Sequence, residues 1–230
     1  MRVLITGGAG FIGSHLADHY IARGDAVVAI DDMTRGQREN LDPQVELVQC
    51  SVAEMGSHVW DTDYDVVYHL AARIGVGASL QNPLRMLHEH AVDIHKICRF
   101  ARNCGARLIV ASTSEVYGNQ AVPDDGYRED SSVVIGPSHI PRWGYALTKL
   151  YDEHVALGWH RQAQLDVVVV RLFNVAGPRQ FAAGGCVIPI FCQQAVTGAP
   201  ITVHGNGHTI RTLTHVQDVV RALVALAEAP

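Results

Sequence analysis

Concentrated positive charge is the first feature that the sequence lacks. Its 230 residues include 18 lysines and arginines against 23 aspartates and glutamates, a formal net charge of −5. No basic block or stripe offsets that balance, so the chain has no electrostatic footprint of the kind that nucleic-acid binding requires. We therefore expect no nucleic-acid partner.

Long apolar runs are also missing. The N-terminal run is interrupted by glycine from position 7 onward, too early for a signal-peptide core or a membrane span. We expect a cytoplasmic protein with no membrane partner. The five cysteines are scattered, odd in number and without a CxxC pair, which favours reduced thiols. The close histidine pairs lack acidic or cysteine partners at ligand spacing, so no metal is expected; these pairs are His88/His90 and His204/His208.

Short β-branched runs alternate with amphipathic stretches along most of the chain. That alternation predicts a parallel, doubly wound α/β sheet. The expected strands are 3–6, 26–30, 45–48, 65–69, 107–112 and 166–173, and the expected helices are 11–23, 84–103 and 143–163. Residues 118–143 are rich in Pro, Gly, Asp and Ser and predict a long functional loop.

The pattern becomes looser after the sixth strand. A helix is expected near 187–197, a short strand at 201–204 and a helix from about 216. We interpret 1–173 as the main domain and 174–230 as a small substrate lobe interleaved with it, which is either incomplete in this chain or shortened. No repeat or linker marks a separate second domain.

A glycine-rich turn follows the first strand and leads directly into a helix. Gly7 permits the tight turn, Gly10 lets backbone N–H groups approach a pyrophosphate, and Gly13 lets helix and strand pack closely. The next strand ends at Asp31, at the distance expected for a carboxylate that binds ribose hydroxyls. This context predicts a Rossmann-type dinucleotide site. An acid at Asp31 repels a 2′-phosphate and favours NAD over NADP, although Arg35 could receive such a phosphate unless Asp32 holds it in an ion pair.

A tyrosine and a lysine stand four residues apart in the segment YALTK. On a helix Tyr145 and Lys149 share one face, where an ammonium and a nicotinamide ring would lower the pKa of the phenol and make it a base. Upstream, the fifth strand ends in hydroxyl side chains at the carboxyl edge of the sheet, where doubly wound proteins bind ligands. Thr113 is the expected hydroxyl beside Tyr145.

In combination, these motifs resemble those of the extended short-chain dehydrogenase/reductases that modify nucleotide sugars. The segments that carry the resemblance are TGGAGFIG, HLAA (69–72), STSEVYG (112–118), YALTK and RLFNVAGPRQ. The resemblance covers nearly the whole chain in order. It implies that Tyr145 removes the proton of a sugar 4-OH while hydride moves from C4 to NAD.

The resemblance also implies roles for residues that spacing alone does not assign. Cofactor contacts, besides the residues named above, are expected from Phe11, Ile12, Asp32, Ser51, Val52, Leu70, Ala71, Ala72, Tyr145 and Lys149. Substrate contacts are expected from Thr113, Asn174, Val187, Ile188 and Arg211. Ion pairing at the surface is the alternative for Arg211, and core packing is the alternative for Val187 and Ile188. The family further implies a homodimer formed through the helices at 84–103 and 143–163.

The residues after Thr113 bear on the reaction that follows oxidation at C4. Ser114 and Glu115 resemble the Thr-Ser-Glu run of UDP-glucuronate decarboxylases, whereas 4,6-dehydratases usually carry an Asp-Glu pair there. We expect a decarboxylase in which Ser114, Glu115 and Arg211 orient or protonate what remains after carboxylate loss. A 4-epimerase, a 4,6-dehydratase and a non-catalytic NAD sensor stay as alternatives, and a structural carboxylate is the alternative for Glu115. His90 replaces a usual Asn, and Asp93 replaces a usual small residue.

Overall fold

One parallel sheet organises the molecule. The structure is a computed structural model and describes residues 1–56, 59, 63–73, 82–120, 122–123, 126–181, 186–208 and 210–230. Six strands run in the spatial order β3-β2-β1-β4-β5-β6, the order typical of a dinucleotide-binding doubly wound sheet. The strands are β1 (Arg2–Thr6), β2 (Ala26–Asp31), β3 (Glu46–Gln49), β4 (Val66–His69), β5 (Arg107–Thr113) and β6 (Val167–Leu172). The predicted fold class is confirmed.

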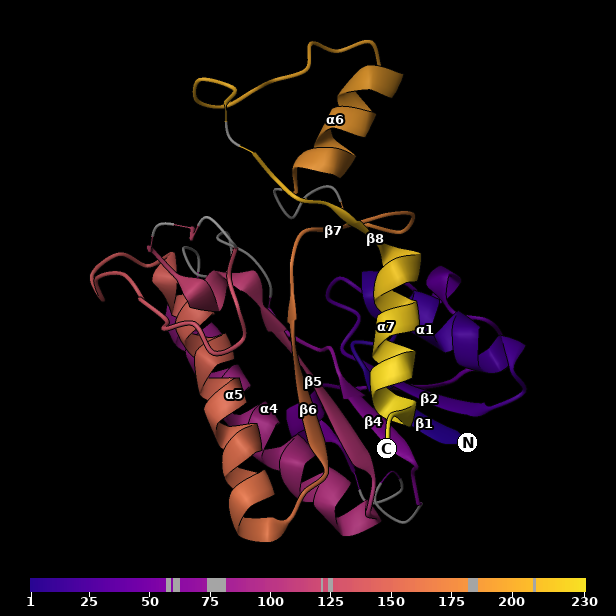
Figure 1. The fold of residues 1–230 in the computed structure, drawn as a ribbon. Helices are drawn as coiled ribbons and strands as arrows, with labels where there is room; N and C mark the ends of the chain where they lie inside the picture. The colour runs from indigo at the N-terminus through magenta and orange to yellow at the C-terminus, as the bar shows by residue number, and fades with distance from the viewer. Residues whose placement is uncertain are drawn as a thin grey trace.

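Helices cover both faces of this sheet (Figure 1). The helices α1 (Phe11–Ala22) and α7 (Val216–Glu228) pack on one face, and α4 (Pro83–Cys104) and α5 (Trp143–Ala163) pack on the other. Successive strand side chains point to opposite faces, so Val3 and Ile5 join the α1/α7 core while Leu4 joins the α4/α5 core. Because both faces are covered, the strands are nearly continuous apolar runs.

Local sequence signals explain how α4 begins and ends. Asn82 caps its N-terminus by accepting a hydrogen bond from the N–H of Arg85, and Pro83 occupies the first turn, where no intrahelical donor is needed. Gly105 ends the helix in the left-handed conformation with φ 67°. Its buried stripe includes Ile94, Ile97 and Ala101. The predicted helix at 84–103 is therefore confirmed almost to the residue.

The C-terminal part of the chain divides between the main body and a projecting segment. The helix α6 (Val187–Val196) stands away from the sheet, with no residue fully buried, whereas α7 returns to the core through Val220 and Leu223 (Figure 1). A two-stranded sheet joins β7 (Val175–Ala176) to β8 (Thr214–His215). The division of the chain at residue 174 stays a prediction.

The structure corrects one expectation from the sequence pattern in this region and adds two strands that the pattern did not predict. Residues 201–204 form no strand, because they lie exposed and unpaired with any β-strand in the described chain. The short strands β7 and β8 were missed, since two-residue strands are too short to show an alternating pattern.

In the part of the chain that the structure describes, no helix is both long and apolar enough to cross a bilayer.

Candidate active site

The glycine-rich turn between β1 and α1 is packed so closely that several of its glycines, Gly7 and Gly13 among them, have no room for a side chain. A Cβ on Gly7, whose φ is 70°, would lie 2.8 Å from the backbone nitrogen of Ala71. A Cβ on Gly13 would lie 2.2 Å from the carbonyl oxygen of Gly7. No side chain caps the N-terminus of α1, so its first N–H groups face the turn where an anion can accept from them.

Asp31 stands beside this turn at the end of β2. Its Oδ2 accepts a hydrogen bond from the N–H of Ala9 at 3.0 Å, and its Oδ1 accepts from the N–H of Met33 at 2.9 Å. Burial raises the pKa of Asp31, and these two hydrogen bonds oppose the rise. Each carboxylate oxygen keeps a further lone pair, which suits a vicinal diol.

Asp32 points to a different partner from the one expected. It pairs with Arg73 at 3.6 Å and accepts hydrogen bonds from Thr34, while the guanidinium of Arg35 lies over the ring of Phe181 at 6.0 Å. The suggested ion pair between Asp32 and Arg35 is wrong, because Arg73 from the turn after β4 takes that place.

The segment after β4 closes the other side of the glycine turn. The N–H of Leu70 donates to the carbonyl of Thr6 at 3.1 Å, and the N–H of Ala71 donates to the Thr6 hydroxyl at 3.2 Å. Ala72 follows directly.

Ser51, two residues after β3, caps the short helix η2 (Val52–Glu54).

Val52 is only 3% exposed and belongs to the core, so its side chain is not free to meet a ligand.

The glycine turn, the open N-terminus of α1 and the Asp31 carboxylate together fit NAD. Phe11 and Ile12 form the first turn of α1 at this site.

The hydroxyl pair predicted from sequence is assembled in the structure. Thr113 ends β5, Tyr145 lies in the first turn of α5, and the Thr113 hydroxyl is close enough to the phenol to lower its pKa. Tyr145 is 8% exposed and Lys149 is 2% exposed. Burial raises the pKa of Tyr145, the carboxylates of Glu115 and Asp152 raise it further, and the Thr113 hydrogen bond lowers it.

Lys149 is held by a buried carboxylate that the sequence pattern did not take into account. The Lys149 ammonium donates to Asp152 Oδ2 at 3.2 Å, so a buried carboxylate neutralises much of its charge. The protein groups together raise the pKa of Tyr145. The expectation that the Lys149 ammonium and the nicotinamide ring together lower it stays a prediction.

Ser114 and Glu115 open the short helix η3 (Ser114–Tyr117) directly after β5. The N–H of Glu115 donates to the Thr113 hydroxyl oxygen at 3.3 Å. Burial raises the pKa of the Glu115 carboxyl and Arg142 opposes the rise. Because its pKa is raised, the Glu115 carboxyl is more easily protonated than an exposed glutamate. It is also close enough to Tyr145 to raise the pKa of the phenol.

The expected substrate residues are spread more widely. The Asn174 amide donates to the carbonyl of Thr212 at 3.1 Å, which places it beside the β7/β8 sheet. Arg211 is exposed and donates to the carbonyl of Ile210. Val187, which is 43% exposed, and Ile188 begin the projecting helix α6. Core packing, the alternative for these two residues, is therefore not what the structure shows.

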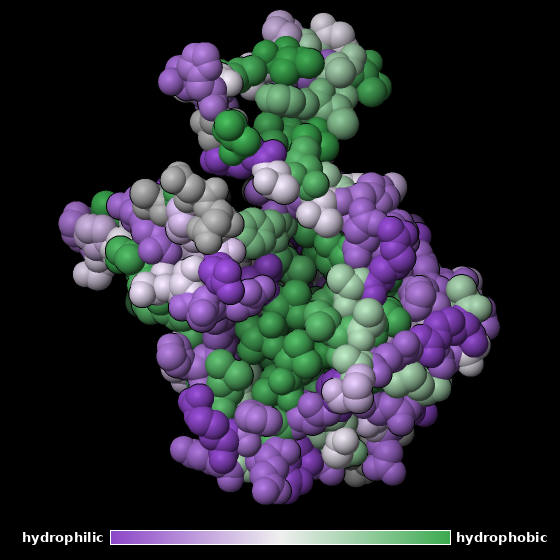
Figure 2. Space-filling model, viewed as in Figure 1, coloured by the Kyte–Doolittle hydropathy of each residue, from purple (hydrophilic) through white to green (hydrophobic). Residues whose placement is uncertain are grey.

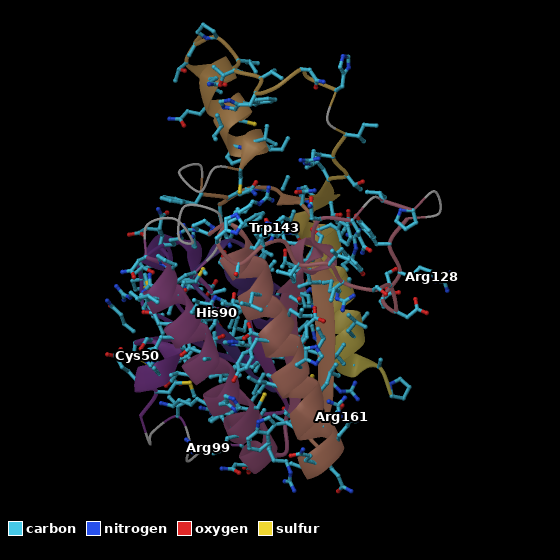
Figure 3. The ribbon with its side chains drawn as sticks, turned by 90° about the vertical axis from the view of Figure 1, so that its left-hand side faces the viewer. Cys50, His90, Arg99, Arg128, Trp143 and Arg161 are labelled. Carbon is cyan, nitrogen blue, oxygen red and sulfur yellow. The ribbon has the colours of Figure 1, made fainter. Side chains whose placement is uncertain are left out.

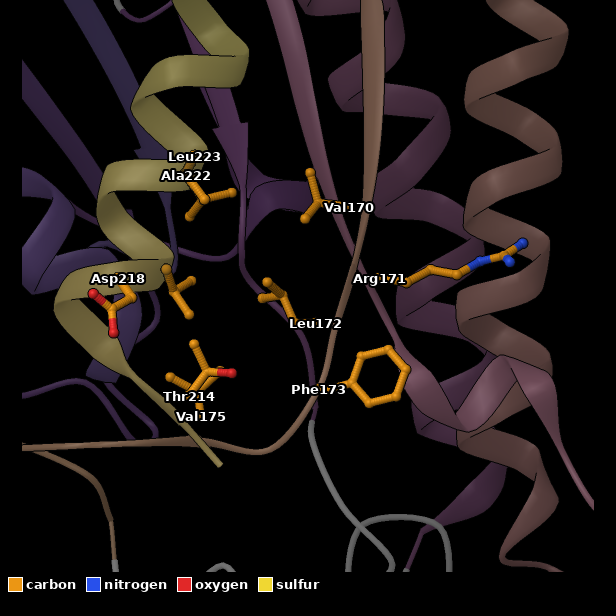
Figure 4. A pocket seen from close by; sticks show the side chains of 10 residues that line it. Val170, Arg171, Leu172, Phe173, Val175, Thr214, Asp218, Ala222 and Leu223 are labelled. Atoms are coloured by element: carbon orange, nitrogen blue, oxygen red, sulfur yellow. The ribbon is translucent and has the colours of Figure 1, made fainter. Parts of the chain in front are cut away.

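A shallow apolar hollow lies between β6 and α7 (Figure 4). Val170, Leu172, Val219 and Leu223 are among its lining residues, and apolar surface is visible at the same place in Figure 2. None of Thr113, Tyr145 and Lys149 lines it. This hollow is thus separate from the candidate catalytic groups.

Two residues beside Tyr145 and Lys149 were missed as site residues. Asp152 binds Lys149, and His90 binds Asp152. Asp152 lies three residues after Lys149, so helical spacing could have revealed it. His90 showed itself only as a departure from the family pattern, because its contact comes from another helix.

The fold and these groups define a class of protein: a Rossmann-type enzyme of the short-chain dehydrogenase/reductase kind, with Tyr145 as the candidate base. The chain belongs to the NAD dependent epimerase/dehydratase family, whose model matches residues 3–230. NAD is the cofactor of this family. The resemblance inferred from the motifs is confirmed.

Named relatives narrow the comparison. The chain is 36% identical over 229 residues to a UDP-N-acetyl-alpha-D-glucosaminuronate decarboxylase of Bacillus cytotoxicus, covering 97% of this chain and 70% of that protein. It is 35% identical over 233 residues to UDP-glucuronic acid decarboxylase 1 of Arabidopsis thaliana, covering 99% of this chain and 52% of that protein. The chain thus spans about half the length of the Arabidopsis relative.

A solved structure gives the same picture of the fold. The UDP-glucuronic acid 4-epimerase from Bacillus cereus, in complex with UDP-glucuronic acid and NAD, superposes with a TM-score of 0.87 at 28% identity. The match covers 100% of this chain and 74% of that chain.

Proposed function

We propose that this chain acts on a UDP-linked hexuronate, oxidises it at C4 and releases its carboxylate as carbon dioxide. The observation that carries the proposal is the meeting of Thr113, Glu115 and the buried Tyr145 at the carboxyl edge of the sheet. Decarboxylase relatives that match nearly the whole of this chain support the choice of reaction.

NAD, when bound, supplies the hydride acceptor for C4. Tyr145 takes the proton of the 4-OH, and the Thr113 hydroxyl stabilises the phenolate form because its hydrogen bond lowers the pKa of the phenol. Oxidation makes the C6 carboxylate a β-keto acid, whose C5–C6 bond breaks and leaves its electron pair at C5. Glu115, whose pKa is raised by burial, is the group that returns a proton to C5.

Arg211 is proposed to bind the substrate diphosphate or carboxylate. Its guanidinium is exposed, and no ion pair to it occurs within the described ranges. Asn174, Val187 and Ile188 are proposed to contact the sugar and nucleotide. Ser51, Leu70, Ala71 and Ala72 are proposed to line the cofactor.

Mass analysis tests the proposal directly. Incubation with NAD and UDP-glucuronate, UDP-N-acetylglucosaminuronate or UDP-glucose separates the three reactions. The hydride taken from C4 either returns to the sugar or stays on the cofactor, so a product lighter by carbon dioxide, or by carbon dioxide and two hydrogens, means decarboxylation. A product lighter by water means dehydration, and an isomer of equal mass means epimerisation. We expect decarboxylation of a uronate, abolished by Tyr145→Phe with cofactor binding retained. An equal-mass isomer would instead establish the 4-epimerase alternative, which the Bacillus cereus structure favours.

We also propose that the chain forms a homodimer through α4 and α5. Large apolar side chains are exposed on these helices, including Leu84, Val92, Leu147 and Tyr151. Such exposed apolar residues on adjacent helices are typical of a surface that another subunit covers.

A further inference from the structure

Three ionisable side chains meet in the buried layer between α4 and α5. His90 comes from α4, and Lys149 and Asp152 come from α5; their exposed fractions are 5%, 2% and 0%. Asp152 Oδ2 accepts from the Lys149 ammonium at 3.2 Å and lies 3.2 Å from His90 Nδ1. Figure 3 places His90 between the two helices. We call this group the buried triad.

Stability alone is a poor reason for such a group. Burying charges costs more solvation than an isolated ion pair usually recovers, and apolar residues of the same volume often serve a core better. The buried triad is also incompletely satisfied, because Asp152 Oδ1 and His90 Nε2 are buried without a hydrogen-bond partner in the described chain. Unpaired buried polar atoms call for a functional explanation. Among the described residues no group of acidic, histidine and cysteine side chains is arranged to hold a metal ion.

The buried triad lies next to Tyr145. The rings of His90 and Tyr145 meet edge to face, with centroids 6.4 Å apart. The Asp152 carboxylate is one of the two charges that raise the pKa of Tyr145. Since Asp152 both holds the lysine and opposes ionisation of the phenol, it controls how much positive charge Tyr145 experiences.

Other charged groups around the buried triad come from three further directions. Asp93 lies on α4 one turn after His90, Glu115 faces Tyr145 from η3, and His69 lies at the end of β4. Burial and the Lys149 charge lower the pKa of His69 to about 3. His69 therefore carries no charge at neutral pH, and the carboxylates of Asp152 and Glu115 are the charges that raise the pKa of the phenol.

We propose that Asp152, held by His90, is a positioning residue that anchors the Lys149 ammonium and limits the positive charge that Tyr145 experiences. The part that concerns Tyr145 rests on the proposed function, whereas the anchoring of Lys149 is independent of any sugar substrate. The two parts call for separate experiments.

Lysine NMR tests the anchoring. The chain has two lysines, Lys96 and Lys149, and Lys96 donates to the carbonyls of Ala53 and Met55, away from the buried triad. In protein labelled on lysine, we expect Asp152→Asn to shift the ε-CH₂ signal of Lys149 and to make its ammonium easier to deprotonate, because a buried cation loses its counter-ion. The signal of Lys96 is the internal control and stays in place. A Lys149 signal that is the same in both proteins at every pH would refute the anchoring.

The pH profile of C4 oxidation, followed as the reduction of NAD in a single turnover, tests the effect on Tyr145, using the sugar nucleotide that the mass assay identifies. Asp152→Asn removes a negative charge, so the acid limb moves to lower pH, by about one pH unit, which is about tenfold in rate on that limb. His90→Leu leaves the Asp152 charge less compensated, so the limb moves to higher pH. His90→Asn keeps a donor and lies closer to wild type.

Glu153→Gln is the matched control, because Glu153 is a buried carboxylate on the same helix that pairs with Arg171 and Ser112 instead. We expect it to lose stability, measured by thermal unfolding, without moving the acid limb. A purely structural role for Asp152 predicts the same for Asp152→Asn, and that result would overturn this part of the proposal. If the mass assay finds no product from any of the sugar nucleotides, the proposed function fails, while the lysine spectra still decide the anchoring.

Discussion

A single methyl group at Gly13 should disable the cofactor site. The Cβ of Gly13→Ala would lie 2.2 Å from the Gly7 carbonyl oxygen and 2.8 Å from Gly8 Cα. Both are backbone atoms, so the contact cannot be relieved by a side-chain rotation. The glycine turn has to move by about 1 Å to restore ordinary van der Waals distances.

Two magnitudes follow from this displacement. Overpacking of a close contact costs about 3 kcal/mol, and the better helix propensity of alanine returns about 1 kcal/mol, so the free energy of unfolding should fall by about 2 kcal/mol. For a chain of this size that is a loss of about 5 °C in Tm. Displacing the binding groups by about 1 Å should weaken NAD binding about a hundredfold.

Gly158→Ala is the matched control. Gly158 also lies inside a helix, α5, and a Cβ there meets nothing within 4 Å. We expect it to raise the free energy of unfolding by about 0.5–1 kcal/mol and to leave NAD binding unchanged. Chemical unfolding and calorimetric titration with NAD measure both quantities. The reasoning is refuted if Gly13→Ala binds NAD as tightly as Gly158→Ala does.

Three further predictions concern other parts of the molecule. Burial and nearby carboxylates raise the pKa of Asp93 from 3.8 to about 7, so its contribution to stability is full below pH 4 and is lost as the pH rises through 7; Asp93→Asn should therefore raise Tm at pH 8 and change it little at pH 4, and equal shifts at both values would contradict this. Thr113→Val removes the hydroxyl that lowers the pKa of Tyr145, so the acid limb of single-turnover NAD reduction should move to higher pH with NAD affinity retained. An acid limb that stays in place would contradict this role of Thr113. Val92→Arg places a charge on the exposed face of α4 and should convert a dimer to a monomer in analytical ultracentrifugation, whereas an unchanged sedimentation coefficient would place the interface elsewhere.

Local features of the sequence were sufficient for the sheet and for most of the site's parts. Glycine spacing located the turn after β1, β-branched runs located the six main strands, and apolar residues at three- and four-residue spacing located α4. Each of these signals acts within a few residues along the chain. The same is true of Tyr145 and Lys149, which helical geometry alone puts on one face.

What the tertiary structure alone decided is the charge around those groups. Helical spacing puts Asp152 beside Lys149, but only the packing of α4 against α5 brings His90 to Asp152 and buries all three side chains. Likewise, Arg73 rather than Arg35 reaches Asp32 because the turn after β4 lies beside the end of β2. Electrostatic effects depend on distance through space and on burial, and neither is encoded in the spacing of residues along a chain.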